Sequence, residues 1–539
     1  MEDKSFHDYH ASLGVSPGFT SARAYRHTIS ILANYVRKQI DSKLKILKAF
    51  SITTDAWTDQ LLRKYIAITF HAIDPETFKL FSFPRDVLFI PENHTWYHVT
   101  NKIAEAIHAH TSNSANLSCV VTDNGSNFVK MSVALMRDLD VAAIEGIGED
   151  DWEAPANDIA DFETSGWRCV AHTMQLAVLD VLDTNKGSAP DNWRAVITNV
   201  RGVCTTVRVS ANLRNQLKDV QACKSRPNKI PKVDCPTRWS TLFYMLQRFD
   251  VIYEDLRNLA LLGAFDDRSS DWTFPLHADM HKVRALVIAL EPMEKFIRLL
   301  EGEKYITISN VPKRLYDCMS TLHGLVNNAE GLPVTRLLLE SLDQRLGFIL
   351  KEVNLSLVAA ALDPRYGDLR RYVHFNNGIV NEGLIDSVWN AVANWANEYN
   401  QLEPVIEMNP RFPSFSNNSL TNLTSTVLKI REHHENNHDT IHNEDPLQYW
   451  KSMFDNFILT QPLSNLLLCI LCIPATSAPS ERVFSKGRLI LPRLRAHLNP
   501  ACVEDLFLIS EWSKSEHFVL DELLNEFVYW LEFTPQHDS

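Results

Sequence analysis

The spacing of apolar residues in the first part of the chain has the period of a β-strand. Residues 47–54 form an apolar, β-branched run that stops at Asp55. Residues 65–73 alternate between apolar and polar and end at a turn signal, and residues 79–83 begin a third alternating run. These three segments predict an antiparallel meander of strands.

A helix and further strands follow the meander. In residues 95–110 apolar positions recur at three- and four-residue intervals, which predicts an amphipathic helix. Residues 117–121 are almost wholly apolar, as in a strand buried on both faces, and the strand stops at Asp123. Residues 167–171 predict a short strand that leads into a helix from His172. Together these segments predict a mixed α/β sheet.

The rest of the chain has mostly the helical period. Residues 193–458 predict a large all-helical region, broken between 404 and 445 by a polar stretch, rich in Asn, Ser and His, that predicts a mobile loop. We expect one helix over residues 477–487 and another that opens at Asn499-Pro500. The apolar run 466–473 is far too short to cross a bilayer and predicts a buried helix.

Length and composition narrow the class of protein. With 539 residues and 45% hydrophobic content, the chain can form two or three domains and a large core. Nine scattered cysteines do not form a disulfide framework and fit a reducing cytosol or nucleus. The N-terminus lacks the apolar segment of a secretory signal, so we expect neither secretion nor a membrane partner. The formal net charge of −13 requires any DNA contact to come from local basic patches or bound cations.

Two aspartates stand at the ends of predicted buried strands. Asp55 and Asp123 would face the crevice where open α/β sheets bind ligands. Adjacent carboxylates need a neutralising cation, and Mg²⁺ takes one or two carboxylates while keeping sites for water and phosphate. Two such ions about 4 Å apart support phosphodiester cleavage. The spacing alone does not exclude a simpler role, in which Asp55 and Asp123 are each a turn residue or a helix cap and bind no metal.

Five short motifs occur in the order seen in hAT transposases. They are Thr54–Thr58, Thr122–Asn127, Arg168–His172, Thr237–Ser240 and Pro474–Ser485. The chain resembles this family from about Leu32 to Trp512, and in particular its relatives with an N-terminal BED zinc finger. Five ordered motifs are highly specific together.

The resemblance implies a ribonuclease-H-like mixed sheet interrupted by a large all-α insertion domain. The expected domains are residues 1–44 as an N-terminal helical remnant, 45–190 as the first part of the core, 191–460 as the helical insertion, and 461–539 as C-terminal core helices with the hAT dimerisation region. The resemblance also implies at least a dimer. A BED finger needs upstream Cys and His pairs, and residues 1–44 contain no cysteine, so we expect this finger to be absent.

The resemblance also implies an acidic triad. Asp55 matches the first catalytic Asp of the family, Asp123 the second and Glu481 the catalytic Glu. These three residues would hold Mg²⁺ or Mn²⁺ as the cofactor. The reaction implied is strand cleavage by water, followed by attack of a DNA 3′-hydroxyl.

Other matching positions imply contacts with DNA. Cys169 and His172 match a Cys-x-x-His pair whose His lies near the scissile phosphate. Arg238 and Trp239 match an Arg-Trp pair whose indole stacks on a displaced base, a contact that contributes about 1–3 kcal/mol. The basic residues that flank the last motif would contact phosphate: Lys486, Arg488, Arg493 and Arg495. A second basic group precedes the Arg-Trp pair: Lys224, Arg226, Lys229 and Lys232.

Each of these assignments has a plainer rival. Cys-x-x-His can bind zinc, but a structural zinc site needs four ligands and no second pair has suitable spacing, so we predict no zinc. Trp239 could be a core residue. The His-rich segment 433–442 is expected to be a solvated loop rather than a metal site.

Two functions therefore remain in view. The first is a hAT transposase-like nuclear protein that dimerises, binds transposon ends or genomic DNA, and cuts and joins strands in a metal-dependent reaction. The intact acids support it. The alternative is a non-catalytic, domesticated, transposase-derived nuclear protein that acts through dimerisation and through DNA or protein binding. The net charge of −13 and the missing finger support this alternative.

Overall fold

The computed structural model describes most of the chain. It covers residues 22–45, 47, 49–91, 96–111, 116–136, 166–235, 238–266, 271–326, 332–374, 378–399, 419–441, 444–456, 460–485, 487–491 and 498–512. None of the helices in these residues is long and apolar enough to cross a membrane.

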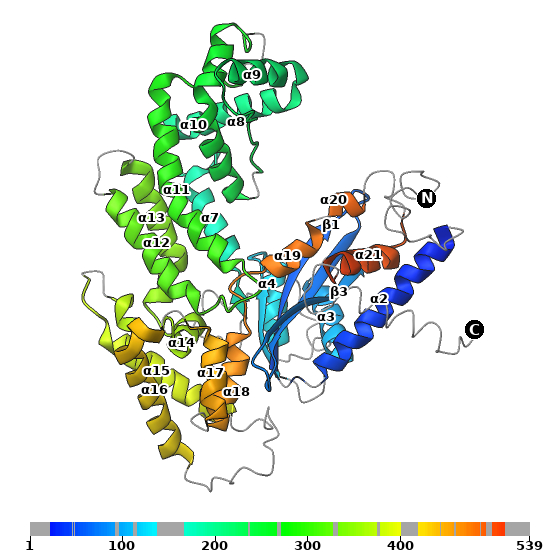
Figure 1. Cartoon of the computed structure of the whole chain (residues 1–539), viewed down its shortest axis with the longest axis vertical. Coiled ribbons are helices and arrows are strands. Elements are labelled where there is room, and N and C mark those ends of the chain that lie inside the picture. The colour runs from blue at the N-terminus through cyan, green and yellow to red at the C-terminus, as the bar shows by residue number, and fades with distance from the viewer. Residues whose placement is uncertain are drawn as a thin grey trace.

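One mixed sheet of five strands forms the right-hand part of the molecule in Figure 1. The strands are β1 (Ala49–Thr58), β2 (Lys64–Ile73), β3 (Leu80–Ile90), β4 (Asn116–Thr122) and β5 (Trp167–Arg168). Their order is β3-β2-β1-β4-β5, in which β2 is antiparallel to β1 and β3, and β4 is parallel to β1 and β5. The predicted mixed sheet and its meander are confirmed.

Two strand boundaries differ from the prediction. β1 does not stop at Asp55, because its antiparallel pairing with β2 continues through Asp55 to Thr58. Its parallel pairing with β4 does end early, at Thr53 opposite Val121. The last strand is only two residues long, because the chain turns into a helix at Val170, before His172.

The two faces of β1 have different partners, as the alternation of side chains along a strand requires. Phe50 and Ile52 belong to an apolar cluster that includes Val99 and Ile103 of α3 (Trp96–His110). On the opposite row, the Ser51 hydroxyl donates to the carbonyl of Cys472 at 3.1 Å. The second face of β1 therefore contacts the C-terminal part of the chain through polar groups.

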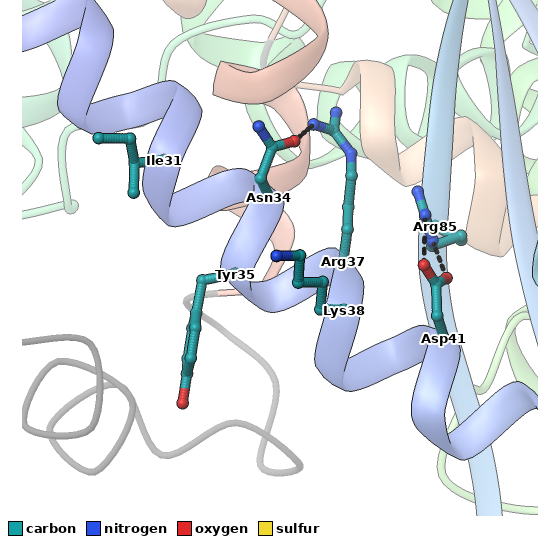
Figure 2. A pocket seen from close by; sticks show the side chains of 7 residues that line it. All are labelled: Ile31, Asn34, Tyr35, Arg37, Lys38, Asp41 and Arg85. Carbon is teal, nitrogen blue, oxygen red and sulfur yellow. Dashed lines mark hydrogen bonds and ion pairs between the residues drawn. The ribbon is translucent and has the colours of Figure 1, made fainter. Parts of the chain in front are cut away.

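Four more helices lie beside the sheet. They are α2 (Ala22–Leu44), α4 (Ser126–Met136), α19 (Ala478–Phe484) and α21 (Pro500–Trp512). α2 is bound to β3 through Arg85, which forms an ion pair with Asp41 at 2.7 Å, and to α21 through Arg37, which pairs with Asp505 at 2.7 Å. Figure 2 shows the surface hollow beside α2 that Arg37, Asp41 and Arg85 help to line.

Helices also make up the remaining described part of the chain, in the left half of Figure 1. They are α7 (Val170–Leu182), α8 (Asp191–Val209), α9 (Ala211–Cys223), α10 (Trp239–Leu261), α11 (Met280–Leu300), α12 (Asn310–Val326), α13 (Leu332–Leu346), α14 (Leu355–Leu362), α15 (Glu382–Tyr399), α16 (Ser419–Ile441), α17 (Pro446–Asp455) and α18 (Gln461–Leu471). One continuous apolar cluster runs through them and reaches the sheet at Cys119 and Val121. The predicted all-helical region is confirmed in its described residues, and the predicted buried helix is confirmed as α18, which ends at Leu471.

The prediction of a loop between 404 and 445 is wrong for residues 419–441, which form α16. The Asn- and His-rich composition hid a helical stripe: Leu423, Val427, Ile430 and His434 are all buried. His434 is fully buried and its Nδ1 lies 3.0 Å from the carbonyl oxygen of Ala361. Burial lowers its pKa to about 4, so it is a neutral core residue rather than a solvated one.

Candidate active site

The first two predicted acids lie together on one edge of the sheet. Asp55 and Asp123 each stand two residues beyond the last parallel pair of β1 and β4, Thr53 and Val121, so the strand alternation puts both on the same face. Asp123 follows β4 directly, and its Oδ1 accepts the amide of Gly125 at 3.0 Å. Asp123 therefore also serves as the turn residue that the plainer interpretation expected.

The third acid, Glu481, reaches the same edge on α19. Ser480, its neighbour, is fully buried and fastens the helix to the sheet. The Ser480 hydroxyl lies 2.8 Å from the carbonyl and 2.7 Å from the hydroxyl of Thr53, and 3.1 Å from the hydroxyl of Thr69. Hydrogen bonds thus join segments 427 residues apart and fix the rotation of the helix that carries Glu481.

The electrostatics of Asp55 follow from this assembly. The pKa of Asp55 is raised to about 7, first by burial and then by the negative charge of Glu481, while Asp123 adds a smaller rise. Positive charge on His172 opposes the rise. Glu481 and Asp123 are therefore close enough to act on Asp55, whose ionised form a nearby cation would favour.

His172, on the first turn of α7, faces the third acid. Its Nδ1 lies 3.7 Å from Oε1 of Glu481. Burial by itself lowers the pKa of His172, but the nearby Cys169 side chain and the charges of Glu481 and Asp123 outweigh that effect and raise it to about 9. An imidazolium at this place supplies positive charge and an N–H donor where a phosphate could bind.

The Arg-Trp pair divides into one exposed and one buried residue. The Arg238 side chain is 63% exposed, and its Nη2 lies 3.8 Å from Oε2 of Glu481. Trp239 is only 5% exposed, begins α10, and its amide donates to Oε1 of Gln175 at 2.6 Å. In this structure Trp239 is the core residue that the plainer interpretation expected, and base stacking stays a prediction that needs the indole to leave the core.

Cys169 is fully buried, so its side chain offers no surface to DNA. Its Sγ accepts the amide of Ser477 at 3.2 Å. Donor atoms of Cys169, His172 and Glu481 all lie within 4.8 Å of one another, so these three residues form a group of potential metal ligands. The predicted DNA contact by Cys169 is disfavoured by this burial.

The predicted basic patches are only partly visible. Lys486, Arg493 and Arg495 lie outside the described residues, and Arg488 lies on α20 (Gly487–Ile490), where its side chain is not described. In the second patch, Lys224 and Arg226 both pair with the buried carboxylate of Asp255, at 3.0 and 2.9 Å. Asp255 therefore offsets part of the positive charge of that patch.

Sequence reasoning missed several residues that border the site. Arg482 pairs with Glu303 and donates to the carbonyl of Glu301, which links α19 to the end of α11. The pKa of Glu301 is raised by partial burial and by the charge of Glu481, so a fourth carboxylate lies near the triad. Arg482 lies within the motif Pro474–Ser485, which was the available signal, whereas Glu301 carries no local signal.

Asn124 borders the site from the other side. Its Nδ2 donates to the Thr173 hydroxyl at 3.0 Å, which ties the turn after β4 to α7. In the sequence, only its place in the same motif as Asp123 indicated that Asn124 could border the site.

Two parts of the chain match known protein families. Residues 426–513 match the hAT family C-terminal dimerisation region. Residues 167–286 match the ZBED1 RNase-like helical domain. The first match begins before the position 461 that the sequence analysis expected for this region and includes α17 to α21.

Curated relatives extend the likeness over most of the chain. A "Putative AC transposase" of Zea mays is 22% identical over 88% of this chain and 58% of its own length, and a "Putative AC9 transposase" of the same plant is 20% identical over 88% and 59%. A "Putative transcriptional regulator tpeD" of Talaromyces stipitatus is 21% identical over 55% of this chain and 34% of its own. The chain thus spans less than two thirds of the length of these relatives.

Proposed function

We propose that this chain, a transposase-like protein of the hAT family, cleaves and joins DNA strands in the nucleus by metal-dependent phosphodiester chemistry. The observation that carries the proposal is the convergence of Asp55, Asp123 and Glu481 at one edge of the sheet. Their segments are far apart in sequence, and a buried hydrogen-bond network holds them together. A purely structural role would not require three acids at one edge.

The strand order supports a ribonuclease-H-like core. β1, β4 and β5 are parallel, β2 is antiparallel, and the order is β3-β2-β1-β4-β5. The long helical region enters after β5, and α19 returns the last acid to the sheet. This arrangement is the one expected when a helical insertion interrupts such a core.

The donor set suits Mg²⁺ or Mn²⁺. Asp55 and Asp123 provide hard carboxylate oxygens on the same face of the sheet, and Mg²⁺ characteristically takes one or two carboxylates. Burial and then the charge of Glu481 raise the pKa of Asp55 to about 7, and a bound cation would favour its ionised form. When bound, the ion would activate the attacking oxygen and stabilise the leaving one.

Protein groups would then position the DNA. His172 and Arg238 stand on either side of Glu481, at 3.7 and 3.8 Å, and both can carry positive charge. We assign them to binding the scissile phosphate. Exposed Arg238 reaches a strand directly, and His172 can donate a hydrogen bond to a phosphate oxygen.

Self-association would bring two such sites to two DNA ends. The match of residues 426–513 to a dimerisation region supports an assembly of at least two chains. The same part of the chain includes α19, so assembly and the position of Glu481 would be coupled.

A second candidate is a non-catalytic nuclear regulator that dimerises and binds DNA or protein. The relative named as a transcriptional regulator favours it, as does a net charge of −13. The two candidates differ in whether the triad does chemistry.

The deciding experiment is a cleavage assay with the full chain and labelled duplexes that carry the terminal repeats flanking its gene. We expect Mn²⁺- or Mg²⁺-dependent nicking at the repeat end, loss of nicking in Asp123→Asn, and unchanged nicking in Asp191→Asn, whose side chain is 93% exposed. If the folded, self-associated wild type binds these duplexes but leaves them uncut with either ion, the enzymatic proposal is wrong and the regulator remains.

A further inference from the structure

A group of three potential metal ligands at the site does not include the two aspartates. Cys169 precedes α7, His172 lies on its first turn, and Glu481 is brought in by α19. One sulfur, one ring nitrogen and one carboxylate oxygen from these residues all lie within 4.8 Å of one another. The fold thus places Glu481 beside the Cys-x-x-His pair as a third potential ligand, which the spacing of the pair in sequence does not indicate.

The surroundings of Cys169 can hold a metal-bound sulfur. Its sulfur is fully buried at the N-terminus of a 13-residue helix and accepts the amide of Ser477 at 3.2 Å. Backbone N–H groups and a helix N-terminus both stabilise negative charge on sulfur. A metal-bound thiolate would keep the hydrogen bond to Ser477 while its remaining lone pairs bind the ion.

The imidazole can also supply a ligand, because metal binding displaces the proton that the ring otherwise holds. In the part of the chain that the structure describes, Nδ1 of His172 is buried and has no hydrogen-bond partner. The nearest carboxylate oxygen, Oε1 of Glu481, lies 3.7 Å away, beyond hydrogen-bond distance. A buried ring nitrogen without a partner, in a residue whose neighbours are two other potential ligands, is a group that a metal ion would satisfy.

We propose that Cys169, His172 and Glu481 form a three-ligand site for Zn²⁺, with water as the fourth ligand. Thiolate and imidazole bind Zn²⁺ well, whereas Mg²⁺ takes oxygen ligands. Three protein ligands and an open position are the usual form of a non-structural zinc site. With Zn–S of about 2.3 Å and Zn–N of about 2.0 Å, ligand atoms stand roughly 3.5 Å apart, so a small rotation closes the site. His172 and Glu481 are 35% and 25% exposed and have room for it.

Zinc here has a regulatory consequence. Glu481 belongs to both sets of ligands, so Zn²⁺ on the sulfur side withdraws it from Asp55 and Asp123. Zn²⁺ would therefore inhibit the metal-dependent cleavage, and this consequence, unlike the binding itself, rests on the proposed function. Arg238, 3.8 Å from Glu481, would lose its ion pair when the carboxylate turns to the metal.

Cobalt provides a direct test, because a Co²⁺–thiolate bond gives a near-ultraviolet charge-transfer band that oxygen and nitrogen ligands do not. We expect the full chain to bind one Co²⁺ with this band and to release it to Zn²⁺ but not to excess Mg²⁺. Cys169→Ser should abolish the band and weaken Zn²⁺ binding at least about tenfold, since even outer-shell changes can cost that much. The control Cys223→Ser, at an exposed cysteine, should bind as the wild type does.

A wild type without the thiolate band, or a Cys169→Ser protein that keeps it, would overturn the zinc site. If Cys169→Ser fails to fold, His172→Ala decides instead: we expect it to keep the thiol and to lose at least about tenfold in Zn²⁺ affinity. Unchanged affinity there counts equally against the site. Asp123→Asn should lose nicking and still bind Zn²⁺, so the failure of the catalytic proposal and the failure of the zinc site give different results.

Discussion

α19 and α21 both reach the sheet from the C-terminal part of the chain, yet they are held in different ways. α19 is fastened by the buried hydroxyl of Ser480, which contacts Thr53 and Thr69. α21 packs through an apolar row that includes Phe507, with ring contacts to Trp57 and Phe484 at 5.4 Å. Hydrogen bonds are directional and fix rotation, whereas apolar contacts mainly fix proximity. α21 also has directional bonds, such as the one from the Phe89 amide to Glu504, but α19, which carries a predicted catalytic residue, is fixed next to that residue by the buried Ser480 hydroxyl.

The difference separates stability from site geometry. Changes on α21 should lower the free energy of unfolding and leave metal binding by the folded protein intact. Changes at the base of α19 should affect both. The following predictions test this separation, beginning with the largest effect.

Phe507→Ala should cause the largest loss of stability. The ring is fully buried between α21, Trp57 and Phe484, and truncation of such a ring costs about 3–5 kcal/mol through lost burial and the cavity left behind. Urea denaturation measures the loss, with Val251→Ala, at a 54% exposed position, as the control. If the folded Phe507→Ala protein binds Mn²⁺ much more weakly than the wild type, the proposed separation is wrong.

Ser480→Ala should cost less stability and more function. Removing the hydroxyl leaves the buried Thr53 and Thr69 hydroxyls without this partner, at a cost of about 1–3 kcal/mol. Because the rotation of α19 is then less restricted, we expect Mn²⁺ affinity to fall further than in Phe507→Ala. Calorimetric titration measures it, and Ser485→Ala, at an exposed hydroxyl of the next turn, should match the wild type. Wild-type affinity in Ser480→Ala would show that the hydrogen bonds do not position Glu481.

Glu504, on α21, should give the smallest effect, and a pH-dependent one. Burial raises its pKa to about 7, so the folded state holds a proton that the unfolded state releases near its ordinary pKa of 4.5. Stability should therefore fall as pH rises from about 4.5 to about 7 and then level off. With allowance for its partial exposure, the contribution is about 1–2 kcal/mol.

Glu504→Gln tests this titration. The amide oxygen of Gln can still accept the amide of Phe89, which Glu504 accepts at 2.9 Å. The difference in unfolding free energy between variant and wild type should grow in favour of the variant as pH increases through this range. A difference that is constant from pH 4 to 8 would contradict the assigned titration.

The same contrast explains what the sequence could predict. Period-two runs and a helical stripe located the strands and α3, because local burial patterns decide these elements. The ordered motifs located Asp55, Asp123 and Glu481. The loop expected before Asp445 was wrong for α16, since composition was given more weight than the buried spacing of Leu423 and Val427.

Other features depend on contacts between distant segments and have no local signal. The hydrogen bonds from Ser480 to Thr53 join residues 427 positions apart, and nothing near either residue indicates the other. The burial of Trp239 and Cys169, and the approach of Glu301 to Glu481, likewise follow from how α7, α10 and α19 meet.

The central claim is that Asp55 and Asp123 form one divalent metal site, and Mn²⁺ binding to the full chain tests it most directly. Calorimetric titration of the wild type, Asp55→Asn, Asp123→Asn and the exposed control Asp191→Asn should give equal affinity in wild type and control. Both site variants should bind at least about tenfold more weakly, since each loses a charged oxygen ligand. Equal Mn²⁺ affinity in all four proteins, with all four folded, would contradict the account.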